Sequence, residues 1–113
     1  MDLAGLYQKV FRACMDFAVY QKRNIRVHVE GVLPMLEEFS DVFLGEQMEG
    51  IGGEEYKQMQ IVWMDILKDI ALGLKENDRI LLEDTVEYGL KVFLELFFEE
   101  QELQGLKEAC VVR

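Results

Sequence analysis

Residues 63–93 read WMDILKDIALGLKENDRILLEDTVEYGLKVF, two stretches of helical periodicity on either side of Asn77-Asp78. In the first stretch apolar residues recur at steps of three and four, so they fall on one face of a helix. Asp78 is a favourable N-cap for the second stretch. Because the turn between the two helices is so short, we expect them to pack against each other in opposite directions.

Each of these helices has a predicted inward face. In the first it is the stripe of Met59, Trp63, Ile66, Ile70 and Leu74. In the second helix, apolar residues spaced three or four apart form two adjacent stripes, which together make up its inward face. The first of these stripes is Leu81, Thr85, Tyr88, Val92 and Leu96, and its neighbour is Leu82, Val86, Leu90, Phe93 and Phe97.

The same periodicity predicts four helices, at residues 2–21, 25–44, 54–75 and 79–103. The glycine-rich stretch 45–53 is the clearest loop, and residues 105–113 form a tail whose structure the sequence leaves open. The first two helices could also be continuous, since about 22 residues of straight α-helix nearly restore the phase of the stripe. The sequence therefore predicts one all-α domain over residues 1–113. Its fold is an antiparallel bundle of four helices, or of three if the first two are continuous.

The charge balance limits the classes of partner. The chain has 22 acidic and 12 basic residues among 113, a net charge of −10, and residues 54–113 hold −7 of it. A surface that displaces the counterions of nucleic acid needs basic residues, so we expect no nucleic-acid partner. The same charge disfavours anionic membrane surfaces, and no apolar run approaches the length of a membrane span.

Two cysteines lie near opposite ends of the chain, at Cys14 and Cys110. The first residues show neither the basic nor the apolar segment of a secretory signal. Free thiols in a reducing compartment are then the expected state. The sequence therefore predicts a cytoplasmic protein.

The stretch from Leu67 to Leu90 carries one family likeness. It resembles a group of small bacterial helical proteins classed as a domain of unknown function, in which an Asn-Asp or Gly-Asp turn leads into a helix of leucine, aspartate, glutamate and tyrosine. The resemblance covers about a fifth of the chain. It implies a cytoplasmic bacterial protein with a helical bundle, and it implies no activity. The matching residues are Leu67, Asp69, Ile70, Leu74, Asp78, Ile80, Leu81, Leu82, Asp84, Glu87, Tyr88 and Leu90.

Few residues could carry catalysis or hold a cofactor. His28 is the one histidine, which excludes a two-histidine metal site within the chain. Ser40, the one serine, lies twelve residues from His28 on the same predicted helix, about 18 Å along its axis, so we expect that the two do not form a catalytic pair. We therefore expect no cofactor.

Paired carboxylates give the enzyme alternative. Asp65 and Asp69 lie on the third helix, and Asp84 and Glu87 lie on the fourth. Across the turn they resemble the acidic magnesium site of all-α nucleotide pyrophosphatases, which would make the chain a magnesium-dependent phosphohydrolase. That family places Glu-x-x-Glu on its first helix, whereas Asp65 and Asp69 here are four apart. On a helical wheel Glu87 lies opposite the apolar arc, which favours a solvated face. A cleft lined by three or more of these acids would favour the enzyme.

The third and fourth helices also carry apolar residues among their charged ones. Stacked apolar pairs on a charged face are typical of a partner surface, although the tail at 105–113 could instead fold back and cover them. We therefore expect a non-enzymatic protein–protein interaction module, either a homodimer, an adaptor or a small chaperone. The expected interface residues are Ile80, Leu94 and Phe98 on the fourth helix and Ile61 and Leu72 on the third.

Overall fold

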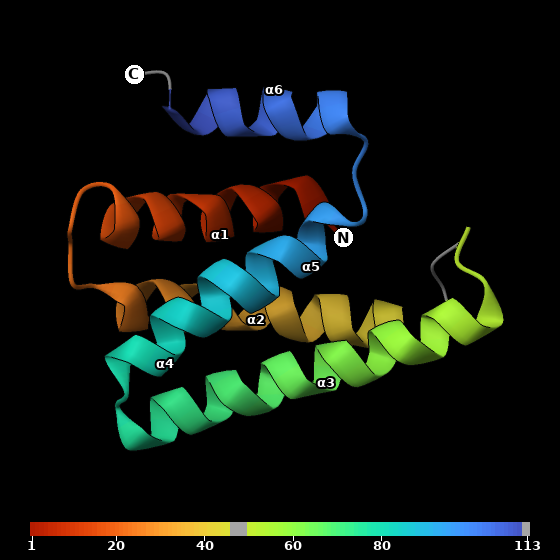
Figure 1. Cartoon of the computed structure of the whole chain (residues 1–113), viewed down its shortest axis with the longest axis horizontal. Coiled ribbons are helices and arrows are strands. Elements are labelled where there is room, and N and C mark those ends of the chain that lie inside the picture. Colours follow the sequence, from red (N-terminus) through yellow and green to blue (C-terminus); the bar gives the residue numbers. More distant parts are fainter. Residues whose placement is uncertain (46–49, 112–113) are drawn as a thin grey trace.

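The computed structural model describes residues 1–45 and 50–111, and all its regular elements there are helical (Figure 1). A helix at residues 79–95 has a π-helical middle part and is divided into α4, η1 and α5. The elements are α1 (Leu3–Ala18), α2 (Ile25–Leu44), α3 (Gly53–Glu76), α4 (Arg79–Asp84), η1 (Thr85–Leu90), α5 (Lys91–Glu95) and α6 (Glu100–Val111).

The helix boundaries confirm part of the predicted organisation. The first helix ends at Ala18 and the second begins at Ile25, so the first two helices are separate. The predicted fourth helix ends at Glu95 rather than at residue 103, and a further helix, α6, follows it. When α4, η1 and α5 are counted as one, the described residues form five helices, one more than predicted. Residues 46–49 of the predicted loop lie outside the described residues.

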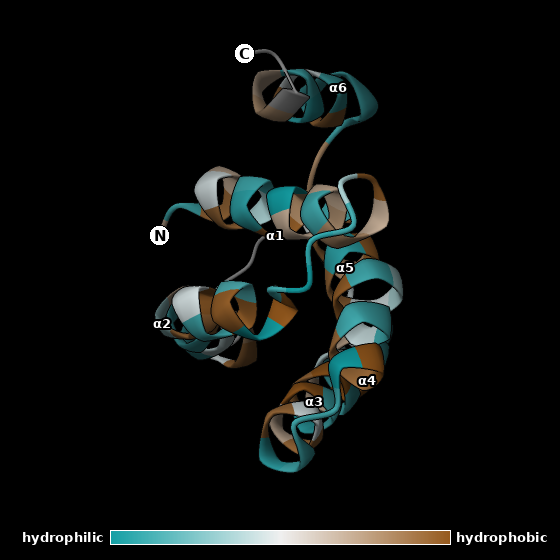
Figure 2. Cartoon of the chain, turned by 90° about the vertical axis from the view of Figure 1, so that its left-hand side faces the viewer, coloured by the Kyte–Doolittle hydropathy of each residue, from teal (hydrophilic) through white to brown (hydrophobic). Residues whose placement is uncertain are grey.

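The helices surround one core, with α6 as an outer layer. Figures 1 and 2 both place α6 against α1, on the side of α1 that faces away from α3. Leu103 and Leu106 of α6 pack on the edge of the core, and Gln8 Nε2 of α1 donates a hydrogen bond to the Leu106 carbonyl. The predicted tail is therefore largely part of a helix that covers α1.

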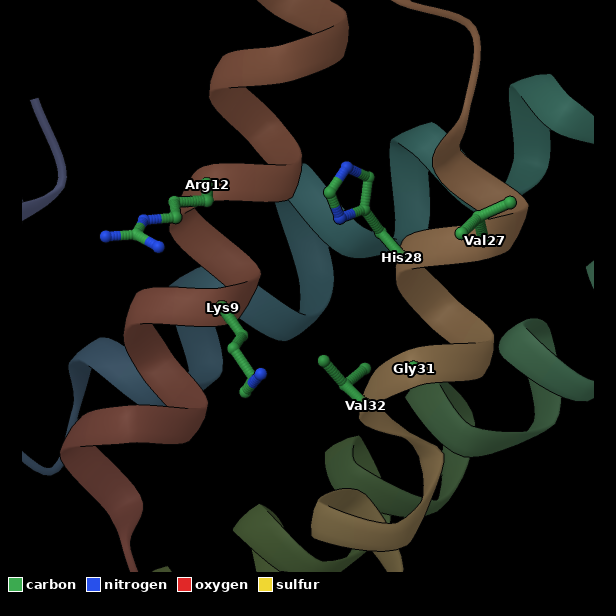
Figure 3. A pocket seen from close by; sticks show the side chains of 6 residues that line it. All are labelled: Lys9, Arg12, Val27, His28, Gly31 and Val32. Carbon is green, nitrogen blue, oxygen red and sulfur yellow. The ribbon is translucent and has the colours of Figure 1, made fainter.

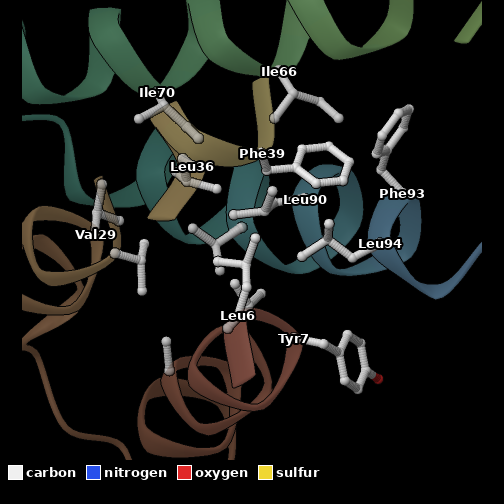
Figure 4. Packing of buried hydrophobic residues seen from close by; sticks show 14 of the residues in the cluster. Leu6, Tyr7, Val29, Leu36, Phe39, Ile66, Ile70, Leu90, Phe93 and Leu94 are labelled. Atoms are coloured by element: carbon white, nitrogen blue, oxygen red, sulfur yellow. The ribbon is translucent and has the colours of Figure 1, made fainter. Parts of the chain in front are cut away.

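Large aromatic side chains fill the centre of the core. Trp63 of α3 is fully buried, and its Nε1 donates to Ser40 Oγ of α2 at 2.8 Å. The ring of Phe39 packs edge-on against Trp63, with their centroids 4.9 Å apart. These contacts join α2 to α3 through side chains, as expected for the inward stripe of α3. Figure 4 shows Phe39 among other buried apolar residues of the core.

The turn between α3 and α4 forms as the sequence predicts. Asn77 ends α3 in the left-handed region, at φ 51°, a conformation that asparagine tolerates better than most residues. The Asp78 carboxylate accepts a hydrogen bond from the Leu81 amide and caps α4. From the start of α2, Arg26 donates to the Leu74 carbonyl at 2.8 Å. This positive charge is a second donor to the Leu74 carbonyl at the end of α3, which also accepts a hydrogen bond from the Asn77 amide.

A π-helical turn changes the phase of the fourth helix. In η1 the Lys91 amide donates to the Val86 carbonyl, five residues back, so this turn contains one residue more than an α-helical turn. One extra residue rotates all that follows by about 100° relative to a regular α-helix. Leu94 is therefore turned into the core, where it is fully buried (Figure 4), and Leu96 is turned out to 64% exposure.

This rotation corrects two predictions. Leu94 and Phe98 are not an outer patch, because Leu94 is buried and Phe98 packs against the Tyr7 ring at a centroid distance of 5.6 Å. Conversely, Tyr88, Val92 and Leu96 were expected on the inward stripe and are exposed. The neighbouring predicted stripe is confirmed, since Leu82, Val86, Leu90 and Phe93 are buried and Phe97 packs on the core.

Two glycines allow α3 to approach the α4–η1 segment closely. A Cβ atom at Gly73 would lie 2.6 Å from a methyl carbon of Leu82, and a Cβ at Gly89 would lie 3.4 Å from Ile66. The first distance is shorter than side chains tolerate without movement, while the second is tight. The absence of a side chain at both positions therefore allows the two helices to pack closely.

We predict that Gly73→Ala lowers the free energy of unfolding by about 1–3 kcal/mol, because the added methyl group overpacks the contact with Leu82. Gly31→Ala in α2 is the matched control, since a Cβ there meets nothing within 4 Å. It should raise stability by about 0.5–1 kcal/mol through helix propensity. Denaturant unfolding followed by circular dichroism measures both, and equal stabilisation by the two variants would contradict close packing at Gly73.

The phase shift at η1 gives a second prediction. Leu94→Ala should cost about 2–5 kcal/mol of stability, as for a buried leucine. Leu96→Ala, two residues away and exposed, should change stability by only about 0.5 kcal/mol. Without the π-turn the order would be reversed, so a larger loss for Leu96→Ala in denaturant unfolding would refute the observed phase.

Candidate interaction surface

The exposed apolar residues concentrate on the hairpin formed by α3 and α4–η1–α5. Eight of the fourteen exposed large apolar side chains among the described residues lie between Ile61 and Leu96. Single exposed apolar residues are ordinary, but a concentration of them marks an interaction site. We call these eight the hairpin surface: Ile61, Val62, Met64, Leu72, Ile80, Tyr88, Val92 and Leu96.

Three predicted interface residues belong to this surface, and two do not. Ile61, Leu72 and Ile80 are exposed, as their place among charged neighbours predicted. Leu94 and Phe98 are covered by their own chain. The sequence analysis missed Tyr88, Val92 and Leu96, which spacing at four residues places along one side of the helix. A regular α-helical wheel places these three residues on the buried side. The π-turn that exposes them cannot be recognised from the spacing of apolar residues.

An open groove of about 320 Å³ lies between α3 and the α4–η1 segment. Figures 1 and 2 show these two elements side by side. The exposed lining is more apolar than polar, with Val62, Ile66 and Leu81 as its apolar side chains, and buried Thr85 contributes to it from the π-turn. The lining residues are Val62, Asp65, Ile66 and Asp69 from α3 and Leu81, Asp84, Thr85 and Gly89 from α4 and η1.

The carboxylates considered for a magnesium site separate into two groups. Asp65, Asp69 and Asp84 line the groove and are exposed. Glu87 is half-buried and its charge acts on Cys14 of α1, so it lies on the opposite side of the helix. Within residues 1–45 and 50–110, no three His, Cys, Asp or Glu side chains come together in a way that could hold a metal ion. The three aspartates therefore border the groove, two from α3 and one from α4.

A second groove, of about 410 Å³, lies on the other side of α3, between α3 and α2. It is mainly apolar, with Glu37, Ser40 and Asp41 of α2 as its polar residues. Ser40 accepts the indole hydrogen bond of Trp63, which fixes its side chain. Helix α3 is thus accessible from both sides. The apolar lining is Leu33, Leu36, Leu67, Ile70, Ala71 and Leu74.

The pocket between α1 and α2, of about 240 Å³, is basic (Figure 3). Lys9, Arg12 and His28 line it, but Figure 3 shows the guanidinium of Arg12 directed away from His28. His28 Nε2 forms a hydrogen bond of 2.7 Å with Asp16, which links α2 to α1. His28 is therefore engaged with Asp16, and Ser40 with Trp63, so the two do not pair.

The buried thiol and phenol of α1 are not placed for nucleophilic chemistry. Burial raises the pKa of the Cys14 thiol to about 12, Lys91 opposes this, and Glu87 and Glu95 add to it. Cys14 therefore stays protonated at neutral pH, and only a thiolate would be a nucleophile. Burial, with a hydrogen bond from its hydroxyl to Glu95, likewise raises the pKa of Tyr7. Cys14 and Cys110 are not joined in a disulfide.

Comparison of the chain with protein families, with curated proteins and with solved structures gives no match. The resemblance over residues 67–90 therefore stays an expectation. Among the helices of residues 1–45 and 50–111, none combines the length and the apolarity that a membrane span requires.

We predict that magnesium and manganese produce no saturable rise in the midpoint of thermal unfolding relative to a chelator. Asp65, Asp69 and Asp84 lack the further converging oxygen ligands that such ions need. A ligand that binds the native state must raise its stability. A saturable rise that Asp69→Asn abolishes would overturn this prediction and favour the phosphohydrolase.

Proposed function

We propose that this chain is a non-enzymatic protein–protein interaction module whose partner binds on the hairpin surface. The observation that carries the proposal is the concentration of exposed apolar side chains between Ile61 and Leu96, beside an apolar groove. A folded protein gains nothing in stability from leaving these residues in water. Their burial against a partner is the simplest use of such a surface.

The energy available is sufficient for specific binding. Tyr88 is 72% exposed, and Val92 and Leu96 follow it at intervals of four residues. Burying a large apolar side chain contributes roughly 1.5–3 kcal/mol, from which association and ordering costs are subtracted. Tyrosine is also enriched among the residues that dominate binding energy. Three such side chains give a compact centre for an interface.

The charge favours a different protein over a second copy. Residues 54–113 have a net charge of −7, and Asp65, Asp69 and Asp84 border the groove. Two copies that met through this surface would bring these carboxylates together, and like charges across an interface are costly. Of the expected roles, an adaptor or a small chaperone therefore agrees better with the charge than a homodimer does.

The magnesium-dependent phosphohydrolase is the second candidate. It is favoured by one observation, that Asp65, Asp69 and Asp84 line the same groove. It is disfavoured by Glu87, which lies on the other side of the helix, and by the lack of a converging ligand set among the described residues. Paired carboxylates at a groove edge are more often a solvated rim than a metal site.

We predict that Tyr88→Ser with Leu96→Ser weakens partner binding at least about tenfold, equivalent to 1.4 kcal/mol, while helix content is unchanged. The matched control is Tyr20→Ser with Val27→Ser, which removes two side chains of comparable exposure from the other half of the chain. A partner retained by the immobilised wild-type protein is purified, and its affinity for each variant is measured by calorimetry.

Circular dichroism and light scattering complete the comparison. A hairpin variant that is folded and binds the purified partner as tightly as wild type refutes the proposed surface. A wild-type dimer that dissociates only in the hairpin variant would keep the surface but assign it to a second copy. Loss of helix content in the hairpin variant would show that Tyr88 and Leu96 stabilise the monomer, contrary to their exposure.

A further inference from the structure

The groove between α3 and the α4–η1 segment has carboxylates on both sides. Asp65 and Asp69 are four residues apart on α3 and follow one edge of it, while Asp84 contributes from α4. No basic side chain lines the groove. The apolar side chains that line the groove are Val62, Ile66 and Leu81. A ligand that fits must therefore combine an apolar strip with positive charge on both of its sides.

The three carboxylates are available to such a ligand. Within the described residues, none of Asp65, Asp69 and Asp84 makes an ion pair or a side-chain hydrogen bond. By contrast, Glu83, next to Asp84, pairs with Arg79 at 3.1 Å and is engaged within α4. The groove acids are thus uncompensated in a chain that already carries a net charge of −10. A cationic partner would relieve this repulsion.

The shape of the groove suits a helix. From Val62 to Asp69 it follows about two turns of α3, roughly 10 Å along the axis. The helix at residues 79–95 carries three further exposed apolar side chains along and just after η1 and α5, those of Tyr88, Val92 and Leu96. Two neighbouring helices leave a depression into which the side-chain ridge of a third helix packs. The described residues contain no strand, and therefore no sheet edge that could bind an extended segment.

We infer that this groove binds an amphipathic helix of a partner protein, with apolar residues at helical spacing in the groove and Lys or Arg residues that pair with Asp65, Asp69 and Asp84. This inference rests on the proposed function and specifies its partner. It is the helix-in-groove mode of recognition with an acidic rim. The strongest basic cluster of this chain itself, Lys22, Arg23 and Arg26, lies around the α1–α2 connection and does not supply such a face.

The test uses a synthetic 14-residue helix of leucine and lysine, with leucines at i, i+3, i+4 and i+7 and lysines elsewhere. Binding to the full chain is measured by fluorescence anisotropy at physiological salt. We expect Asp65→Asn with Asp69→Asn and Asp84→Asn to weaken binding at least tenfold. The control, Glu37→Gln with Glu38→Gln and Asp41→Asn on α2, removes the same charge and should weaken binding less than threefold. Nuclear magnetic resonance shifts should change for residues 62–69 and 81–89.

Further experiments distinguish binding in this groove from non-specific attraction of a basic peptide to an acidic protein. They also distinguish failure of this inference from failure of the proposed function. A peptide of the same composition with scattered leucines should bind at least tenfold more weakly, and Val62→Lys should weaken binding of the amphipathic peptide similarly. Equal loss in the α2 control, or no binding of the amphipathic peptide, overturns the inference. If a peptide with glutamate for lysine binds equally well, the basic partner is refuted while the hairpin surface stands. The proposed function itself is refuted only if the Tyr88→Ser with Leu96→Ser variant binds the purified partner as tightly as the wild type does.

Discussion

The one extra residue in the π-turn at Thr85–Leu90 determines how the rest of the molecule is arranged. It lets a single helix present one face to the core before the turn, through Leu82, and a rotated face after it, through Leu94. The same rotation allows α5 to pack against α1, where Glu95 accepts the hydrogen bond of Tyr7. A straight α-helix would bury Leu96 in place of Leu94. The inner packing and the outer apolar surface therefore have the same cause.

Features that depend on local chemistry could be predicted from the sequence. The Asn77-Asp78 turn, the cap by Asp78 and the burial of Trp63 all follow from residue preference or from spacing of three and four. The close approach at Gly73 follows from the small size of glycine, which lets helices come together. What could not be predicted is that Leu94 turns inward and Leu96 outward after Thr85, because helical periodicity assumes 3.6 residues in every turn. Helix α6 was missed for a related reason, since its few apolar residues, Leu103 and Leu106, give a weak pattern.

The candidate site shows the same division. Sequence reasoning grouped Asp65, Asp69, Asp84 and Glu87 across the short turn as an alternative site, and the groove contains the first three. It failed for Glu87, which lies inside the π-turn and faces α1. It also assigned the surplus of apolar residues to Leu94 and Phe98 when the rotation transfers it to Val92 and Leu96. The fourth helix does expose apolar residues, but which of them are exposed depends on the π-turn, a backbone feature that residue types alone do not indicate.

The acidic edge and the apolar surface have to be understood together. An exposed apolar surface of this kind favours self-association, which net charge opposes. Asp65, Asp69 and Asp84 place that opposition directly beside the apolar groove, where it acts at short range. Under the proposed function, the same carboxylates would attract a basic partner, so the group that opposes a second copy would also favour that ligand. Specificity of this kind is a difference between affinities, and a repulsive element produces it as effectively as an attractive one.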